Sequence, residues 1–300
     1  MLDQRSLPNF FIIGAPKAGT TTLFNIISKF PEVYSATQKE IRFFTKDANY
    51  RKGLAWYQQT YFNGAADYPI RMEATPTYLT WSEKSSRRLD EDYPTHELKF
   101  AVIFRDPVQR AYSHYWHRFR QDHEDLTFEE AIKAEPDRMA KYYDELFSNG
   151  YGRYTYFRAG CYASRLQPFL DRFKKEQFIF LITEDLLPDA YPVTIARIKE
   201  FLEISGDQTP SIKKDNPATS LRWDWMKSPY SRLKHSFLGK FYLSIINEPL
   251  RNKIQNRMYT ATANPPMNPD FASQLRARYF EEIKALERII ERDLSKWMEP

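Results

Sequence analysis

The sequence predicts an α/β protein in which helices flank a central, mostly parallel sheet in three layers. Short, mostly apolar runs at residues 10–13, 98–104 and 178–182 are typical of strands buried on both faces. Between them, apolar side chains recur every three or four residues, as on the inner face of a helix. Strands that alternate with helices favour a parallel sheet with right-handed crossovers. We therefore expect one domain over residues 1–300.

The first apolar run leads directly into a glycine-framed loop. Gly14 and Gly19 bracket Lys17, and three threonines and a helical pattern of apolar residues follow. Unpaired N–H groups and the positive end of the dipole meet at a helix N-terminus, so this loop can hold a phosphate or sulfate beside the lysine charge. In the nucleotide-binding loop G-x-x-x-x-G-K-[ST] the lysine instead follows the second glycine. The motif is therefore P-loop-like, and an ordinary turn with a solvated lysine is the alternative.

Residues 38–44 place charged side chains directly before a pair of phenylalanines. If the aromatic pair anchors this segment in the core, Glu40 lies near the strand ends, where α/β proteins bind their ligands, and it can serve as a general base. A surface glutamate paired with Lys39 or Arg42 is the alternative. Glu73, at the end of a second predicted strand, is a minor candidate for the same role.

The strand predicted at residues 98–104 ends in Arg105 and Asp106, and a proline follows. Asp106 can cap a helix whose first residue is Pro107, so a second helix starts directly after a strand. Polar and basic side chains recur at helical spacing and predict one polar face on this helix: Arg110, Ser113, His114, His117 and Arg118. Arg105 should point into the ligand crevice, which predicts a second phosphate site. A helix face exposed to solvent is the alternative.

The remaining chain carries fewer chemical signals. Thr127 and Glu130 fit a capping box at the start of a long helix, and residues 270–297 predict an amphipathic C-terminal packing helix. Residues 205–268 hold ten lysines and arginines against four acids, so the formal net charge of +5 is concentrated there. We expect this segment to be a basic excursion or lid over the sheet, or else a loosely packed connection.

Composition bounds the class of protein. Of the 300 residues, 42% are hydrophobic and 16% aromatic, which is ample for a large core. Cys161 is the only cysteine, so no intrachain disulfide can form and a reducing compartment is expected. The N-terminus lacks the apolar core of a signal peptide, because Pro8 and nearby charges interrupt it. Nowhere do eighteen apolar residues follow one another, as a membrane-spanning helix would require. We expect a soluble cytoplasmic protein.

Taken together, the two anion motifs resemble those of PAPS-dependent sulfotransferases, in particular the heparan sulfate N- and O-sulfotransferase branch and its bacterial relatives. Residues 14–21 are similar to the 5′-phosphosulfate loop of that family, and Arg105 through Ser113 to its 3′-phosphate motif. Residues 39–44, residues 73–78 and the ending Leu-Glu-x-x-x-x-Arg-Asp-Leu-x-x-Trp agree as well. The resemblance covers residues 8–204 well and the terminal helix more loosely.

The resemblance implies transfer of a sulfuryl group from PAPS to a hydroxyl or amine of a carbohydrate or small molecule, with release of 3′,5′-ADP and no metal requirement. Glu40 would be the catalytic base, and Lys17 would stabilise the leaving group. Arg105 and Ser113 would hold the 3′-phosphate. The 5′-phosphosulfate would be held by the first loop, at Ala15, Pro16, Lys17, Ala18, Gly19, Thr20 and Thr21. Relatives often have lysine in place of Ala74 and histidine in place of Arg42, which bears on the type of acceptor.

Two other functions fit part of the pattern. A P-loop small-molecule kinase would share the strand–loop–helix architecture, and a non-catalytic polyanion-binding module could use the basic residues 205–268. We expect neither nucleic acid nor a membrane as partner. If Glu40 is not the base, Glu73, His114 and His117 are the next candidates.

Overall fold

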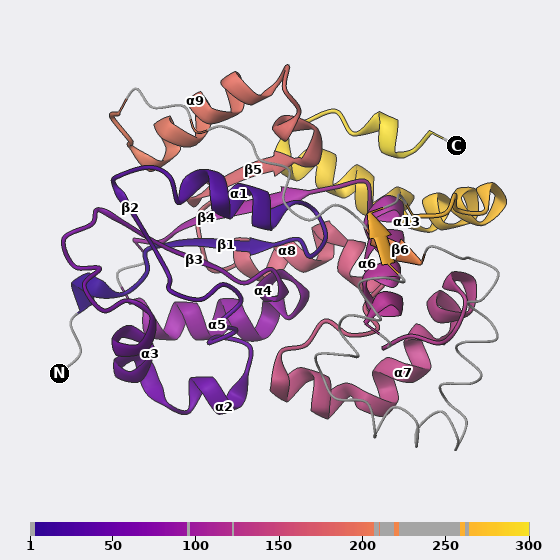
Figure 1. Ribbon diagram of the computed structural model, residues 1–300, viewed down its shortest axis with the longest axis horizontal. Helices are drawn as coiled ribbons and strands as arrows, with labels where there is room; N and C mark the ends of the chain where they lie inside the picture. Colours follow the sequence, from indigo (N-terminus) through magenta and orange to yellow (C-terminus); the bar gives the residue numbers. More distant parts are fainter. Residues whose placement is uncertain are drawn as a thin grey trace.

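The computed structural model describes residues 4–94, 97–121, 123–206, 210, 219–221, 259–261 and 264–299. Five parallel strands form the central sheet in the order β2-β3-β1-β4-β5. They are β1 Phe10–Gly14, β2 Val33–Ser35, β3 Ile70–Ala74, β4 Lys99–Phe104 and β5 Phe178–Ile182. The parallel α/β architecture predicted from the sequence is confirmed (Figure 1).

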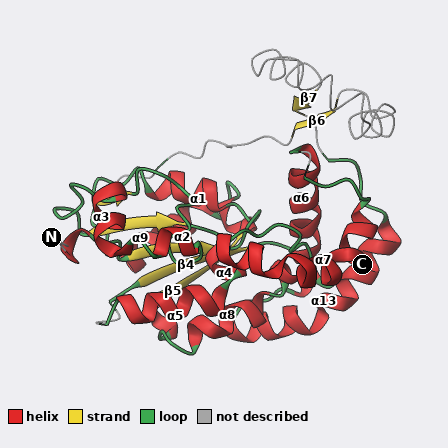
Figure 2. Ribbon diagram, turned by 90° about the horizontal axis from the view of Figure 1, so that it is seen from below, coloured by secondary structure: helices red, strands yellow, loops and turns green. Residues whose placement is uncertain are grey.

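Helices lie on both faces of this sheet. They are α1 Thr20–Ile27, α2 Asp47–Tyr50, α3 Gly53–Tyr61, α4 Thr77–Thr80, α5 Ser82–Asp92, α6 Pro107–Arg120, α7 Phe128–Asn149, α8 Tyr162–Leu170, α9 Tyr191–Leu202 and α13 Pro269–Ile290. Short 3₁₀ turns are η1 Gln4–Ser6, η2 Arg158–Gly160, η3 Lys175–Gln177, η4 Thr183–Leu186 and η6 Ser295–Trp297. Figure 2 shows α1 on one side of the strands and α5, α8 and α13 on the other. The sheet between two sets of helices gives the three layers predicted from the sequence.

A separate antiparallel pair joins β6 Thr219–Leu221 to β7 Tyr259–Ala261. Most of the basic segment predicted at residues 205–268 lies outside the described residues. Within the described part of the chain, no helix combines the length and the apolar character that a bilayer span requires.

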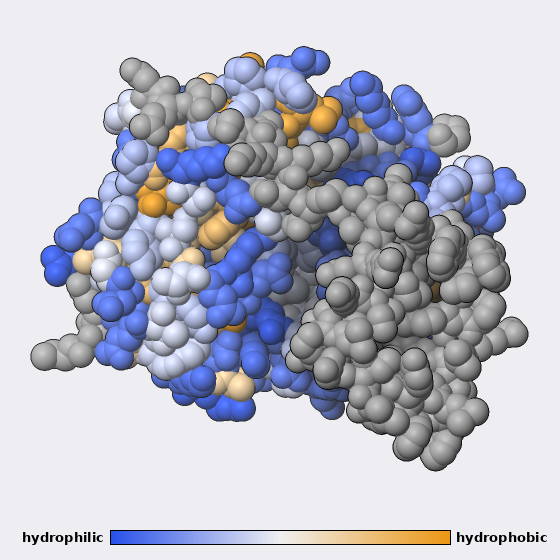
Figure 3. Space-filling view, in the orientation of Figure 1, coloured by the Kyte–Doolittle hydropathy of each residue, from blue (hydrophilic) through white to orange (hydrophobic). Residues whose placement is uncertain are grey.

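The core is centred on the sheet. All five residues of β1 are buried, and so are the last five of β4. Gly14 is required at the end of β1, because a Cβ atom there would lie 2.6 Å from Cβ of Leu79 on α4. At the described surface, in the orientation of Figure 1, most residues are hydrophilic and the hydrophobic ones are scattered (Figure 3). The apolar side chains of the strands are thus enclosed between the two helix layers.

Both predicted helix caps are confirmed. Asp106 precedes Pro107 and accepts hydrogen bonds from the N–H groups of Val108 at 2.8 Å and Gln109 at 3.1 Å. The capping box at the start of α7 is present with both of its hydrogen bonds. These caps are local interactions, which explains why sequence alone predicts them.

The C-terminal helix is shorter than predicted. It ends at Ile290 rather than at Trp297, because Glu291 adopts a left-handed conformation with φ of 53° and the chain then turns. Leu294 donates its N–H back to the Glu287 carboxylate at 2.8 Å, which stabilises that turn. Trp297 is nevertheless buried, so the predicted packing role of this segment holds.

Candidate functional site

The carboxyl ends of β1, β3 and β4 meet at one edge of the sheet. From β1 the chain runs to β2 on one side, and from β3 it crosses over β1 to β4 on the other, so the strand order reverses here. Open α/β sheets bind their ligands at such a reversal. Arg105 follows β4, and its Nη1 donates a hydrogen bond to the Lys17 carbonyl oxygen at 3.5 Å. The structure therefore brings the two predicted anion motifs together.

The loop after β1 is a tight turn fixed to the neighbouring strand. The Ala15 N–H donates to the Ile103 carbonyl at 2.8 Å, and the Ala18 N–H donates to the Ala15 carbonyl at 3.2 Å. Gly19 is the N-cap of α1 with φ of 98°, a conformation that favours glycine. The first N–H groups of α1, beginning at Thr20, have no partner within the helix. This geometry is compatible with the predicted anion cradle, which also includes Pro16 and Thr21 and stays a prediction.

Lys17 lies in this loop, partly buried and close to other cations. Burial, followed by repulsion from Arg120 and Arg105, lowers the pKa of its ammonium to about 8, and Glu40 opposes the shift. Its backbone is left-handed, with φ of 68°. Cations desolvated together in this way favour an anionic ligand, which would relieve their repulsion. Strained backbone also tends to occur at functional sites.

Lys39 belongs to the same group, and the sequence did not single it out. Its Nζ donates a hydrogen bond to Oγ1 of Thr21, directly at the start of α1. Burial lowers the pKa of Lys39, and Glu40 again opposes the shift. Its sequence signals are its place next to Glu40 and within the family-like residues 39–44, and neither assigns it to the anion site.

Glu40 is held at the rim of the site. Its N–H donates to the carbonyl of Ala74, the last residue of β3, at 2.9 Å, while its side chain is exposed. Phe43 and Phe44 are both completely buried, as the predicted anchor requires. The Glu40 charge favours the charged forms of Lys17 and Lys39. Burial lowers the pKa of Arg118, and the Glu40 charge is one of the effects that oppose this shift. A carboxylate thus lies between cations, accessible to a substrate.

Glu73, the minor alternative base, is unsuited to that role. Its side chain is fully buried and accepts hydrogen bonds from the hydroxyls of Tyr57 at 2.6 Å, Tyr78 at 2.7 Å and Thr75. Burial raises the pKa of its carboxyl group, although these three hydrogen bonds oppose the shift. A carboxyl group without exposed oxygens cannot reach an acceptor. Glu73 instead ties β3 to α3 and α4.

The predicted polar face of α6 is wrong in part. Arg110 is completely buried and donates to the Tyr156 carbonyl, and His114 is only 4% exposed. Both side chains pack against the loop that follows α7 instead of facing the crevice. Ser113 and Arg118, in contrast, are partly exposed. The role of Ser113 at a 3′-phosphate stays a prediction.

Histidines on α6 are held neutral. Burial is the largest cause for both, and positive neighbours add to it: Arg110 and Arg118 act on His114, and Lys17 acts on His117. The pKa of His117 falls to about 4, and that of His114 falls well below its usual value. A catalytic base must reach the proton of the acceptor, but His114 is buried and His117 is only partly exposed, whereas the Glu40 side chain is exposed. The carboxylate of Glu40 is the better candidate.

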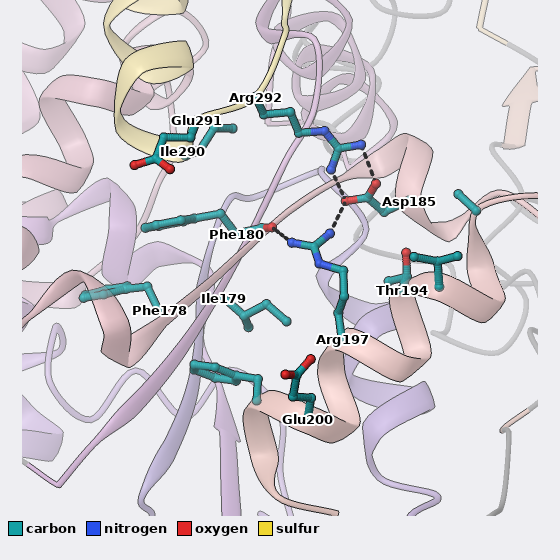
Figure 4. A pocket seen from close by; sticks show the side chains of 13 residues that line it. Phe178, Ile179, Phe180, Asp185, Thr194, Arg197, Glu200, Ile290, Glu291 and Arg292 are labelled. Atoms are coloured by element: carbon teal, nitrogen blue, oxygen red, sulfur yellow. Dashed lines mark hydrogen bonds and ion pairs between the residues drawn. The ribbon is translucent and has the colours of Figure 1, made fainter.

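A cavity of about 830 Å³ lies elsewhere, between β5, α9 and the end of α13 (Figure 4). Its charged groups are largely paired with one another. Asp185 accepts hydrogen bonds from both terminal nitrogens of Arg292 at 2.6 Å, and Arg197 donates to the Phe180 carbonyl at 3.3 Å. None of the predicted site residues lines this cavity. It carries no group placed for catalysis.

Fold and site define an α/β protein with a cationic loop at the switch point of its parallel sheet and an exposed carboxylate at the rim. The family model of the sulfotransferase domain matches residues 7–248, and the chain belongs to this family. The resemblance noted in the sequence is thereby confirmed.

Relatives and a solved structure agree with this assignment. The chain is 32% identical over 204 residues to mouse heparan sulfate glucosamine 3-O-sulfotransferase 3A1, covering 67% of this chain and 48% of that protein. It is 32% identical over 199 residues to the human 3B1 protein, covering 66% and 47%. The chain thus spans about half the length of the curated relatives it matches. The crystal structure of a sulfotransferase from Alicyclobacillus acidocaldarius superposes with a TM-score of 0.69 at 25% identity, covering 98% of this chain and 99% of that one.

Proposed function

We propose that this protein transfers the sulfuryl group of PAPS to a hydroxyl or amine of a carbohydrate acceptor and releases 3′,5′-ADP. The observation that carries the proposal is the contact between Arg105 and the Lys17 loop, which joins two cationic sites beside the accessible carboxylate of Glu40. A donor phosphorylated at both ends of its ribose needs two such sites. Membership of the sulfotransferase family supports the same donor.

The chemistry follows from the placement of charge. The acceptor O–H or N–H gives its proton to Glu40 as its oxygen or nitrogen forms a bond to sulfur. The bond between sulfur and the bridging oxygen of the donor breaks, and the electron pair leaves with 3′,5′-ADP. Lys17 stabilises the charge that grows on that oxygen, and Arg105 holds the 3′-phosphate. As in phosphoryl transfer, the rate comes from in-line positioning and electrostatic stabilisation.

The names of the relatives support a saccharide acceptor, since these proteins are glucosamine 3-O-sulfotransferases of heparan sulfate. On the acceptor side of Glu40 the chain presents Arg42, whose guanidinium lies 4.2 Å from the ring centre of Tyr151. Arginine beside an aromatic ring suits a sugar that carries acidic groups. Ala74, where relatives often have lysine, is completely buried. Arg42 is therefore the better candidate for recognising the acceptor.

Substitution of the base tests the proposal. Glu40→Gln should lower transfer from radiolabelled PAPS to heparan-type oligosaccharides by about 10²–10⁴-fold, the usual contribution of general base catalysis. The affinity for 3′,5′-ADP, measured by calorimetry, should stay within about twofold because Glu40 contacts the acceptor rather than the donor. Glu91→Gln, an exposed glutamate in an i,i+4 pair with Arg87, is the matched control. Full turnover by Glu40→Gln would contradict the assignment of the base.

The rival functions give different results in the same assays. A kinase would bind Mg·ATP tightly and 3′,5′-ADP not at all. A polyanion-binding module would keep its affinity for heparin when Lys17 is replaced by alanine, and it would show no transfer. The single cysteine supports a cytoplasmic location, which cell fractionation tests.

A further inference from the structure

Aromatic side chains gather at the C-terminal end of α7 and in the turn that follows it. Five residues form this aromatic strip: Tyr142, Tyr143, Phe147, Tyr151 and Tyr154. The rings of Tyr143 and Phe147, four residues apart on one helix face, stack with centres 5.3 Å apart and planes at 13°. The rings of Tyr142 and Tyr154 lie 5.9 Å apart. The helix end thus carries one ring pair along its own face and contacts the turn through the other pair.

The strip is firmly supported from beneath. It packs on a small buried cluster of Trp81, Met139 and Leu146. Nε1 of Trp81 donates a hydrogen bond to the Tyr151 carbonyl at 2.9 Å, which fixes the turn. Tyr143 is 42% exposed, although its ring packs edge-on against that of Trp81 with centres 5.9 Å apart. The Tyr143 ring is therefore held in place by buried side chains while part of it faces solvent.

Cations accompany the rings along the strip. Arg138 lies 4.6 Å from the ring centre of Tyr154, and Lys141 lies 5.0 Å from that of Tyr142. Arg42 likewise lies over the ring of Tyr151. The guanidinium of Arg138 is ion-paired with Glu124 at 2.6 Å, so among the described residues Arg42 and Lys141 supply the unneutralised positive charge beside the rings. Such a surface offers apolar faces for stacking and donors for hydroxyl, carboxylate or sulfate groups.

The strip begins at the candidate base. Arg42, two residues after Glu40, donates its N–H to Oγ1 of Thr75 at 3.2 Å, and its side chain reaches Tyr151. The contact between Arg42 and Tyr151 therefore joins the site to the near end of the strip. Tyr142 and Tyr143 lie farther along α7.

We propose that the aromatic strip is an extension of the acceptor site that binds sugar residues beyond the reacting one. This inference rests on the proposed function. A pyranose ring has an apolar C–H face that stacks on an aromatic ring, while its polar groups can meet the adjacent cations. A small phenolic acceptor would end at Glu40 and would leave the strip unused. The acceptor is accordingly an oligosaccharide or a longer glycan chain.

Acceptor length tests this inference. We would measure kcat/KM with heparan-type di-, tetra-, hexa- and octasaccharides and radiolabelled PAPS, at low salt and at about 0.5 M NaCl. The octasaccharide should exceed the disaccharide by about tenfold, equivalent to about 1.4 kcal/mol. Much of that gain should persist at high salt, because stacking is not screened as charge attraction is. Tyr143→Ala should bring the ratio close to one. Phe280→Ala, an exposed aromatic on α13, is the matched control and should keep it.

The outcomes separate this inference from the proposed function. A wild-type kcat/KM ratio of octasaccharide to disaccharide near one, or a ratio that falls to one at high salt, would contradict sugar binding by the strip. Transfer to the disaccharide would still support sulfotransferase activity. Failure to bind 3′,5′-ADP and to sulfate any acceptor would overturn the proposed function itself. Calorimetry with the same oligosaccharides tests sugar binding by the strip without any need for turnover. Equal affinities of the wild type and Tyr143→Ala for the octasaccharide would contradict that binding.

Discussion

Lys17 should make donor binding depend on pH within a narrow window. Its pKa falls from 10.5 to about 8 because it is buried and because Arg120 and Arg105 repel it. A bound anion offsets that repulsion and raises the pKa again, so the protein must take up a proton wherever Lys17 is neutral before binding. The affinity for 3′,5′-ADP should be full below pH 8 and should decrease as the pH rises above it.

The size of the effect follows from the pKa. One unit above it, about one-tenth of Lys17 carries a proton, so affinity at pH 9 should be about tenfold lower than at pH 7, or about 1.4 kcal/mol. Lys39 is the neighbour whose pKa burial also lowers, so Lys17→Arg is needed to separate its titration from that of Lys17. The remaining groups should not obscure the change. Phosphate has its second pKa near 6, so the ligand keeps its charge throughout. His117, with a pKa of about 4, is already neutral.

Calorimetry in two buffers of different ionisation enthalpy measures both the affinity and the protons taken up. We expect nearly none at pH 7 and about one per 3′,5′-ADP at pH 9. Lys17→Arg keeps its charge over the whole window and should bind with an affinity that does not depend on pH. Constant affinity of the wild type from pH 7 to pH 9, without proton uptake, would refute the reasoning.

Three further predictions concern the destabilisation caused by the buried Lys17 charge, the stability of the fold and the metal requirement. Lys17→Met should raise the free energy of unfolding at pH 7 by about 3 kcal/mol, measured in urea, because a pKa lowered to about 8 penalises the charged lysine below that pH. Asp185→Asn should lower it by about 2–3 kcal/mol, because two charged hydrogen bonds to Arg292 are lost. Unchanged urea curves would contradict either prediction. Sulfate transfer should survive millimolar EDTA, since Lys17 supplies the positive charge; its loss would favour a metal-dependent mechanism.

The sequence predicts the strands and caps well because their signals are local. Apolar runs identify buried strands, and Asp106 with Pro107 identifies a helix start that the structure reproduces. Once the strands are known to be parallel, their carboxyl ends must share one edge, so Lys17 and Arg105 can be placed together. This part of the site needs only periodicity and topology.

Side-chain orientation is less predictable because it depends on distant packing. Arg110 and His114 share helical spacing with Ser113, yet Tyr156 and the loop around it bury them. Glu73 is removed from solvent by hydroxyls from other elements. The end of α13 depends on the left-handed conformation of Glu291. Glycine and asparagine usually mark such helix ends in a sequence, and neither stands here. Such contacts join residues far apart in the sequence.

Unfavourable conformations and charges are concentrated where the ligand is expected. Lys17, Glu40 and Arg42 all have positive φ, at 68°, 59° and 56°, although none is glycine. Each such residue costs of order 1–3 kcal/mol unless its surroundings fix it, and burial of Lys17 beside other cations adds to that cost. Hydrogen bonds to the ends of the strands fix Glu40 and Arg42, so the sheet stabilises the strained segment. An anionic donor removes the electrostatic part. We therefore expect an anionic donor to raise the stability of the protein when it binds.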